Sequence, residues 1–227
     1  MPAEIAFDLA LEHGRCVGVR LPESGADVDA LASEWLAPGE RAFAESLSPL
    51  RRRSWVGGRA ALRATLQRLG LVCPAVLADA RGAPALPEGI LGSISHKQRL
   101  AVALVAGGGP GEALGVDLEV DAPARVDIAS RVLTLEEAEE LAGLDAMARA
   151  REVILRFSAK ESIYKALDPF VRRYVDFLEV SLRPRPDGSA EVVARLRQGE
   201  GPFMIEPRWR RLDGLVLTTA RVTFPPP

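Results

Sequence analysis

Two acidic residues stand in a stretch that is otherwise typical of a buried β-strand, LGVDLEV at residues 114–120. Side chains two positions apart in a strand point to the same face, so Asp117 and Glu119 share one side of it. Neighbouring carboxylates repel each other, and removing them from water is costly unless a cation or hydrogen-bond donors compensate. The pair predicts a cation site, with a solvated edge strand as the alternative interpretation.

A second charged group lies in RFSAKESIYKAL, residues 156–167, which we predict to be helical. At helical spacing, Phe157, Glu161 and Lys165 share one face. An exposed Glu–Lys pair at this spacing would be ordinary, but the neighbouring Phe157 predicts a buried face, where such a pair is rarely incidental. Glu161 then completes a set of three carboxylates, the ligands that Mg²⁺ prefers. The chain has only 2 His, too few for a zinc cluster.

Two further segments are suited to phosphate binding. We expect GSISH, residues 92–96, to form a tight turn whose backbone N–H groups and serine hydroxyls hold a phosphate, with His96 adding a charge-assisted bond. The alternative is a turn with a structural histidine. A predicted helix carries several arginines, most of them expected on a solvated face and one or two on a phosphate: Arg51, Arg52, Arg53, Arg59 and Arg63. Together, the segments indicate a substrate with more than one phosphate group.

The elements that would position these residues fall into two halves. In the first, we predict strands over residues 5–21 and a helix from the N-cap Ser48 to Gly70. Gly57 and Gly58 inside this helix cost about 1 kcal/mol each relative to Ala. They indicate either a close backbone approach or a helix that starts later. A Pro/Gly loop, a strand and a second strand complete this half.

The glycine-rich stretch 107–112 is the predicted boundary between the halves. Thr134 and Glu137 form a capping box, and a longer helix is expected over about residues 145–167. Four strand-like segments follow, with a hairpin turn at PDGS, residues 186–189. Each half therefore combines strands with one major helix.

The composition is that of a globular protein, with 227 residues, 48% hydrophobic residues and a net charge of −2. No charge bias points to nucleic acid, and no segment is long and apolar enough for a signal peptide or a membrane span. Cys16 and Cys73 are expected to be reduced thiols of a cytosolic protein. Lysine is rare, and two of the three lysines are Lys160 and Lys165, where a compact point charge is suited to chemistry.

Three motifs in this order and spacing resemble the signature motifs of the 4′-phosphopantetheinyl transferases, most closely the surfactin/enterobactin-synthetase type. They are RGAPALPEGILGSISH, LGVDLEV and RFSAKESIYKAL. The family patterns are an SxSH-like turn, G-V/I-D-x-E and F/W-x-x-K-E-S/A-x-x-K. GRAALRA, from Gly58, also resembles the Gly-Arg helix of the family. The ordered combination is far more specific than any one motif.

The resemblance implies an α+β fold of two similar lobes, each a small sheet packed with a major helix, with coenzyme A bound between them. Residues 1–111 would contact the nucleotide and 3′-phosphate, and residues 112–227 would carry the magnesium and catalytic residues. The implied reaction is transfer of 4′-phosphopantetheine to a serine of an apo acyl, peptidyl or aryl carrier protein, releasing 3′,5′-ADP. It would require Mg²⁺, with Mn²⁺ as a substitute.

The residue roles are also implied by the resemblance, position by position. Asp117, Glu119 and Glu161 would bind the metal. The catalytic residues would be Glu161, Lys165 and Lys160, with Lys165 on the transferred phosphate and the serine proton going to Glu161 or a bound water. Coenzyme A would contact Arg51, Arg52, Arg59, Arg81, Ser95, His96 and Lys165, with His96 at the 3′-phosphate.

Two rival functions stay open at this point. One is a Mg²⁺-dependent nucleotide pyrophosphatase, and the other is a non-catalytic protein that binds coenzyme A or a carrier. The carrier served could belong to siderophore, polyketide, nonribosomal peptide or fatty-acid synthesis. Arg172 and Arg173 are candidates for docking it, or are solvated loop residues. We expect a cytoplasmic monomer that binds neither nucleic acid nor membranes.

Overall fold

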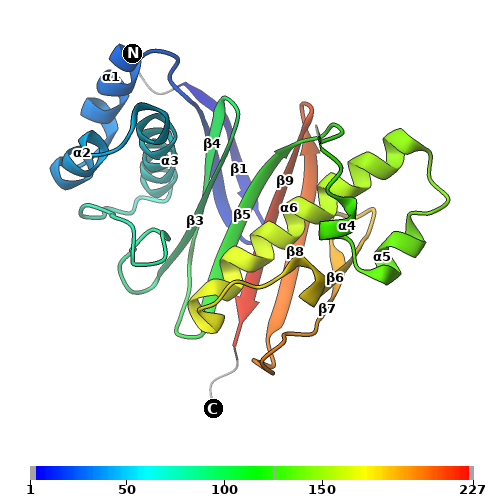
Figure 1. Cartoon of the computed structure of the whole chain (residues 1–227). Helices are drawn as coiled ribbons and strands as arrows, with labels where there is room; N and C mark the ends of the chain where they lie inside the picture. The colour runs from blue at the N-terminus through cyan, green and yellow to red at the C-terminus, as the bar shows by residue number, and fades with distance from the viewer. Residues whose placement is uncertain (1–3, 125, 225–227) are drawn as a thin grey trace. The chain divides into compact units, whose positions relative to one another are not determined.

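The computed structural model describes residues 4–124 and 126–224. The chain divides into two compact units, Met1–Pro110 and Gly111–Pro227, and each contains antiparallel sheet and one long helix (Figure 1). The division falls within the glycine-rich stretch 107–112. The mixture of helices and antiparallel sheets is the α+β class predicted from the sequence.

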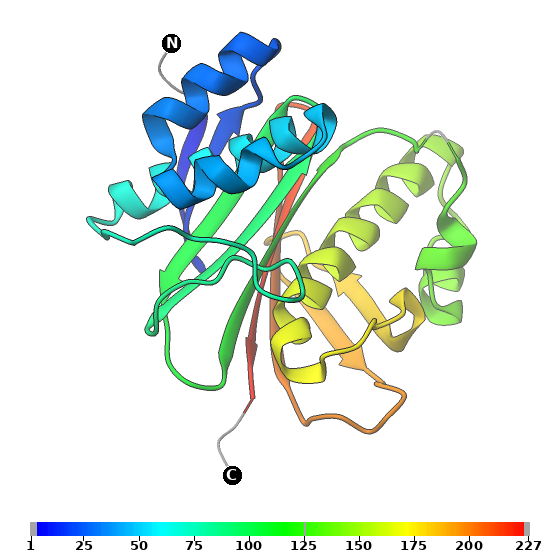
Figure 2. The same ribbon diagram turned by 60° about the vertical axis from the view of Figure 1, so that its left-hand side comes forward.

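Unit 1 is a four-stranded antiparallel sheet, in the order β1-β2-β4-β3, covered by a long helix. Helix α3 packs on β2, β3 and β4, and helices α1 and α2 lie beside α3 (Figure 2). Cys16 and Cys73 are both buried and free, as predicted. The elements are β1 (Ile5–Leu11), β2 (Gly14–Arg20), α1 (Gly25–Trp35), α2 (Pro38–Glu45), α3 (Pro49–Arg68), β3 (Ile90–Lys97) and β4 (Leu100–Gly107).

The two glycines inside α3 are explained by close packing. A Cβ atom on Gly57 would lie 2.1 Å from Cδ2 of Leu21, and one on Gly58 would lie 2.9 Å from Cγ2 of Ile94. The helix begins at Pro49 with Ser48 at the N-cap position, although the Ser48 side chain makes no capping hydrogen bond. Close approach of the helix to the strands, and not a later start, therefore accounts for both glycines.

Unit 2 contains a three-stranded antiparallel sheet, in the order β5-β9-β8, and a separate hairpin of β6 and β7. Helix α6 packs along β5 and β9 (Figure 1). The elements are β5 (Glu112–Val120), α4 (Ala129–Val132), α5 (Leu135–Glu140), α6 (Ala146–Val171), η1 (Phe177–Glu179), β6 (Val180–Pro184), β7 (Ala190–Ala194), β8 (Met204–Leu212) and β9 (Leu215–Thr223).

Local sequence signals explain most element boundaries of unit 2. Asp145 caps α6 by accepting hydrogen bonds from the backbone of the first turn, and Thr134 and Glu137 form the predicted capping box of α5. Helix α6 continues past its predicted end at residue 167 although Pro169 lies in its last turn, and Arg172 closes the helix with φ 53°. The predicted strand near residue 177 begins instead as the short helix η1.

Among the described residues, none of the helices is long and apolar enough to cross a bilayer.

Strand β5 and helix α6 meet at Gly115. A Cβ atom at this position would lie 1.8 Å from the carbonyl oxygen of Ser162 and 3.1 Å from the backbone nitrogen of Ala166. Backbone atoms in a helix cannot move away cheaply, so only glycine permits this approach. The contact brings the strand acid Asp117 within reach of side chains on α6.

Replacing Gly115 with alanine is therefore expected to lower the free energy of unfolding by about 3 kcal/mol, the upper end of typical overpacking. Urea denaturation followed by circular dichroism measures the change. Gly143→Ala is the matched control, because a Cβ atom there meets nothing within 4 Å. Equal stabilities of the two variants would contradict the packing explanation.

Candidate active site

The two acids on β5 are buried. Asp117 is 5% exposed and Glu119 is 9% exposed, although β5 is an edge strand of its sheet. Val116 and Leu118, which alternate with them, are also buried. The solvated-edge interpretation of this strand is therefore excluded, and the two carboxylates need compensating partners inside the protein.

Helix α6 supplies those partners from one stripe of its surface. Ser158, Glu161 and Lys165 are separated by three and four positions, which places them on one face. The Lys165 ammonium donates to Oδ1 of Asp117 at 2.8 Å and to the carbonyl oxygen of Val116 at 2.9 Å. The Ser158 hydroxyl donates to Oδ2 of Asp117 at 2.9 Å. Both oxygens of the Asp117 carboxylate are thus held by α6.

The remaining acids belong to the same electrostatic environment. Burial raises the pKa of Glu161 above its ordinary value, the Lys165 ammonium opposes this, and the charges of Asp117 and Glu119 raise it further. The Lys165 ammonium contacts Asp117 directly, and the Glu161 carboxyl is affected by the charges of Lys165, Asp117 and Glu119. That the three acids form one metal site stays a prediction from the motifs.

This group is suited to a hard cation by its chemistry. Its three carboxylates and one ammonium carry excess negative charge when all are ionised, and oxygen ligands of this kind bind Mg²⁺. Within residues 4–124 and 126–224, no three His, Cys, Asp or Glu side chains are already arranged as a metal-binding group. Asp117 is paired with Lys165 instead, so a metal ion would share or replace that contact.

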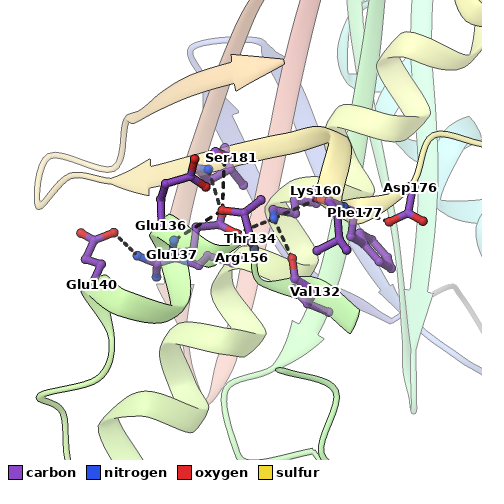
Figure 3. A network of polar contacts seen from close by, with 12 residues as sticks. Val132, Thr134, Glu136, Glu137, Glu140, Arg156, Lys160, Asp176, Phe177 and Ser181 are labelled. Carbon is purple, nitrogen blue, oxygen red and sulfur yellow. Dashed lines mark hydrogen bonds and ion pairs between the residues drawn. The ribbon is translucent and has the colours of Figure 1, made fainter. Parts of the chain in front are cut away.

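Lys160 lies in a different, buried network (Figure 3). Its ammonium donates to Oε2 of Glu137 at 2.6 Å, to the carbonyl oxygen of Val132 at 2.7 Å and to that of Phe177 at 3.1 Å. Glu137 also accepts the backbone N–H groups of Thr134 and Leu182, both at 2.8 Å. The network joins α6 to α4, α5, η1 and β6.

These contacts contradict the expectation that Lys160 acts with Lys165. An ammonium has three protons, and all of them are used on acceptors within this network. Phe157 also belongs to this side of the helix, because its ring lies 5.4 Å from that of Phe177. Phe157 thus packs toward η1, at the border between the Lys160 network and the stripe of Glu161 and Lys165 that the helical spacing predicted.

In unit 1, the predicted phosphate-binding turn is part of a strand. Ser93, Ser95 and His96 lie within β3, paired in register with Leu104, Val102 and Ala101 of β4. The expected turn follows at residues 98–99. Because β3 is an edge strand, only the backbone groups that face away from β4 are outside the sheet pairing. The two serines are buried, whereas His96 is exposed.

Arg59 is the most unusual of the predicted arginines. It is 4% exposed, its Nε donates to the carbonyl oxygen of Val76 at 2.8 Å, and its guanidinium lies 4.8 Å from the ring centre of Trp55. Burial lowers the pKa of Arg59 to about 10, Glu40 opposes this and Arg63 adds to it. Among the described residues, no ion pair joins Arg59 to a carboxylate, so an anionic ligand would offset its burial.

The other arginines have varied surroundings. Arg63 is structural, because it donates to buried Glu40 and to the carbonyl oxygens of Cys73 and Pro74. Arg52 pairs with Asp29 at 2.6 Å. Arg51, in the first turn of α3, and Arg81, in the loop after it, are exposed. The solvated-face interpretation thus fails for Arg59 and Arg63 and fits Arg51.

Arg173 is held within unit 2. It donates to both oxygens of Glu179, at 3.0 and 2.7 Å, and to both oxygens of Glu200, at 2.6 and 3.1 Å. The hydrogen bonds from Arg173, assisted by backbone N–H groups of Asp176 and Arg197 and opposed by burial, lower the pKa of Glu179 to about 2. Arg173 therefore serves the fold and is a poor docking candidate.

The ion pair between Arg173 and Glu179 predicts that the free energy of unfolding depends on pH in the acid range. Because the folded pKa lies below the ordinary value of 4.5, the pair stabilises fully above about pH 4.5 and is lost as pH falls toward about 2. Arg173→Gln should be less stable than wild type near neutral pH, and the difference should shrink as pH falls through this range. Urea titrations at several pH values measure it. A difference that stays constant down to pH 2 would contradict the prediction.

Two polar residues of the site were not anticipated as contacts, namely Ser158 and Thr218, which are fully buried beside Asp117. In the separate Lys160 network, Glu137 was predicted only as a helix cap. The spacing of Ser158 from Glu161 and Lys165 was a usable signal. Thr218 becomes visible only once the pairing of β5 with β9 is known.

Comparison with known proteins identifies the class. Residues 39–106 match the 4′-phosphopantetheinyl transferase N-terminal domain family, and residues 113–219 match the 4′-phosphopantetheinyl transferase superfamily. The chain is 36% identical over 200 residues to 4′-phosphopantetheinyl transferase Svp of Streptomyces mobaraensis, covering 84% of this chain and 80% of that protein. It is 30% identical over 181 residues to 4′-phosphopantetheinyl transferase Npt of Nocardia iowensis, covering 74% and 81%.

A solved structure is also similar in part. A holo-(acyl-carrier-protein) synthase from Bacillus anthracis, in complex with CoA, is 19% identical and has a TM-score of 0.41. The match covers 49% of this chain and 96% of that one. The assignment rests on the family matches and the sequence relatives. The chain belongs to the 4′-phosphopantetheinyl transferase superfamily and is an enzyme of the surfactin/enterobactin-synthetase type.

Proposed function

We propose that this enzyme transfers 4′-phosphopantetheine from coenzyme A to a serine of an apo carrier protein in a Mg²⁺-dependent reaction. The serine hydroxyl gives its proton to Glu161 or to a water, and its oxygen bonds to the phosphorus that bears pantetheine. The bond from that phosphorus to the bridging oxygen breaks, and 3′,5′-ADP leaves with the electron pair. The observation that carries this proposal is the pair of buried strand acids, Asp117 and Glu119, next to Lys165 and Glu161 of α6, both of them partly buried. The relatives named as transferases support it.

In unit 2, the acidic residues and the lysine would have different roles in the reaction. Asp117, Glu119 and Glu161 would hold the cation, and bound Mg²⁺ would supply charge neutralisation at the pyrophosphate. Lys165 would provide the positive charge for the transferred phosphate, because its side chain is 26% exposed whereas that of Lys160 is 1% exposed. We assign Lys160 to the support of helix α6.

Unit 1 would bind the nucleotide end of coenzyme A. His96 is exposed on an edge strand, so a 3′-phosphate could reach it from solvent, and Ser95 lies next to it on the same strand. Arg59 is the arginine we favour for a phosphate contact, because its buried charge lacks a carboxylate partner among the described residues. Arg51, Arg52 and Arg81 stay weaker candidates.

Calorimetric titration with two ligands tests the nucleotide assignment. His96→Ala should weaken coenzyme A binding roughly tenfold, the scale of one charge-assisted hydrogen bond, because the 3′-phosphate loses its donor. Dephospho-coenzyme A lacks that phosphate, so its affinity should be the same for both proteins. Equal losses for the two ligands would contradict the 3′-phosphate role.

The carrier partner is proposed as an apo acyl, peptidyl or aryl carrier domain. Of the two arginines after α6, Arg172 is exposed and remains a docking candidate, whereas Arg173 is engaged by Glu179 and Glu200. Neither of the rival functions, a nucleotide pyrophosphatase or a non-catalytic binding protein, is favoured by a feature of the structure. A cytoplasmic monomer stays a prediction from the sequence.

A further inference from the structure

Two buried hydroxyl groups form a hydrogen-bonded chain that ends at Oδ2 of Asp117, whereas Lys165 binds Oδ1. Thr218 of β9 stands directly opposite Asp117 in the strand register, and Ser158 projects from α6. Both residues are 0% exposed. The Ser158 hydroxyl lies 2.9 Å from Oδ2 of Asp117 and 3.0 Å from the Thr218 hydroxyl, which in turn lies 2.8 Å from the Ser158 carbonyl oxygen.

The proton positions in this chain are determined by the anion at its end. An ionised carboxylate only accepts hydrogen bonds, so the single Ser158 proton is directed to Asp117. Ser158 then offers only lone pairs to Thr218. The Thr218 proton is therefore shared between the hydroxyl and carbonyl oxygens of Ser158, and the chain runs from Thr218 through Ser158 to Asp117.

This arrangement differs from that of a neighbouring serine. The hydroxyl of Ser162, also fully buried on α6, donates back to the carbonyl oxygen of Ala159 in its own helix at 2.8 Å. That local bond is the usual one for a serine inside a helix. Ser158 instead donates its hydrogen bond to a carboxylate on a strand, and the hydroxyl of Thr218 contacts Ser158 in that orientation.

We propose that Ser158 and Thr218 are positioning residues that orient the Asp117 carboxylate for a divalent cation. They hold Oδ2 on the protein side, which leaves Oδ1, the oxygen now bound by Lys165, for the metal. This inference rests on the proposed function, because it assigns a role toward the metal that the acid cluster would bind. Such outer contacts commonly contribute 10- to 100-fold in metal affinity.

Binding of Mn²⁺ to the full-length protein, followed by the electron paramagnetic resonance signal of free Mn²⁺, tests this without catalysis. Ser158→Ala should weaken Mn²⁺ binding about tenfold. Thr218→Val should weaken it less, and Thr218→Ser, which restores the hydroxyl, should recover it. Ser162→Ala is the matched control, since it removes a buried hydroxyl from the same helix without touching Asp117.

The Mg²⁺ dependence of the transfer rate provides a second readout, because a purely structural role for Ser158 would not change it selectively. The Mg²⁺ concentration for half-maximal transfer should rise in Ser158→Ala, while saturating Mg²⁺ restores most of the rate. Folded Ser158→Ala that binds Mn²⁺ as tightly as Ser162→Ala would overturn the inference and leave the proposed function intact. Wild-type protein that binds no Mn²⁺ would overturn both.

Discussion

Replacing Lys160 with methionine lowers the free energy of unfolding by about 3–5 kcal/mol, because Glu137 is left as a buried charge without its partner. The Lys160 and Glu137 side chains are 1% and 2% exposed, so water cannot take the place of the missing ammonium. The carbonyl oxygens of Val132 and Phe177 also lose a donor. Urea denaturation measures the loss.

A double-mutant cycle separates the ion pair from general damage to the fold. Glu137→Gln removes the charge while keeping much of the shape, so Lys160→Met combined with Glu137→Gln should cost less than the sum of the single changes. Lys160→Met should also keep most of its transfer rate at temperatures well below its melting point. A stable Lys160→Met protein with abolished transfer would instead support the catalytic role that the motif suggested.

Replacing Asp117 with asparagine is expected to lower Mg²⁺-dependent transfer on the order of 100-fold or more. Asparagine keeps the shape and can still accept from Ser158, but it removes the charge that faces Lys165 and that would bind the proposed Mg²⁺. Losing a metal ligand costs several kcal/mol of transition-state stabilisation, and about 1.4 kcal/mol is tenfold in rate. Initial rates at several Mg²⁺ concentrations measure the effect.

Asp121→Asn is the matched control for that variant. Asp121 directly follows β5, where it pairs with Arg151 and Arg211, and it makes no contact with the acid cluster in the part of the chain that the structure describes. The same chemical change there should leave the transfer rate unaltered. Wild-type rates in a folded Asp117→Asn protein would remove Asp117 from the metal site.

Much of unit 2 could be predicted because its signals are local. The alternation around Asp117, the capping box at Thr134 and the turn at Gly188 each depend on residues near in sequence. The contact between Asp117 of the strand and Lys165 of the helix was expected from the motifs. Gly115 explains it physically, because its missing side chain lets strand and helix approach.

The errors arose where long-range packing decides the outcome. Lys160 and Lys165 look equivalent in KESIYK, but their separation by five positions places them on different sides of the helix. The segment that holds Ser95 and His96 was predicted to lie at the tight turn between two strands, because small polar residues suit turns. Pairing with β4 extends the strand through it. Arg59 donates to the carbonyl oxygen of Val76 in the loop after α3, and Arg173 pairs with Glu179 of η1 and with Glu200, contacts that the helical spacing alone does not predict.

Intact-mass spectrometry of an apo carrier protein, after incubation with this enzyme, coenzyme A and Mg²⁺, tests the central claim most directly. We predict a gain of one phosphopantetheine group on the carrier and no gain when a chelator removes the metal. An unchanged mass across several unrelated apo carriers, with an enzyme that is folded and binds coenzyme A, would contradict the proposed transfer reaction.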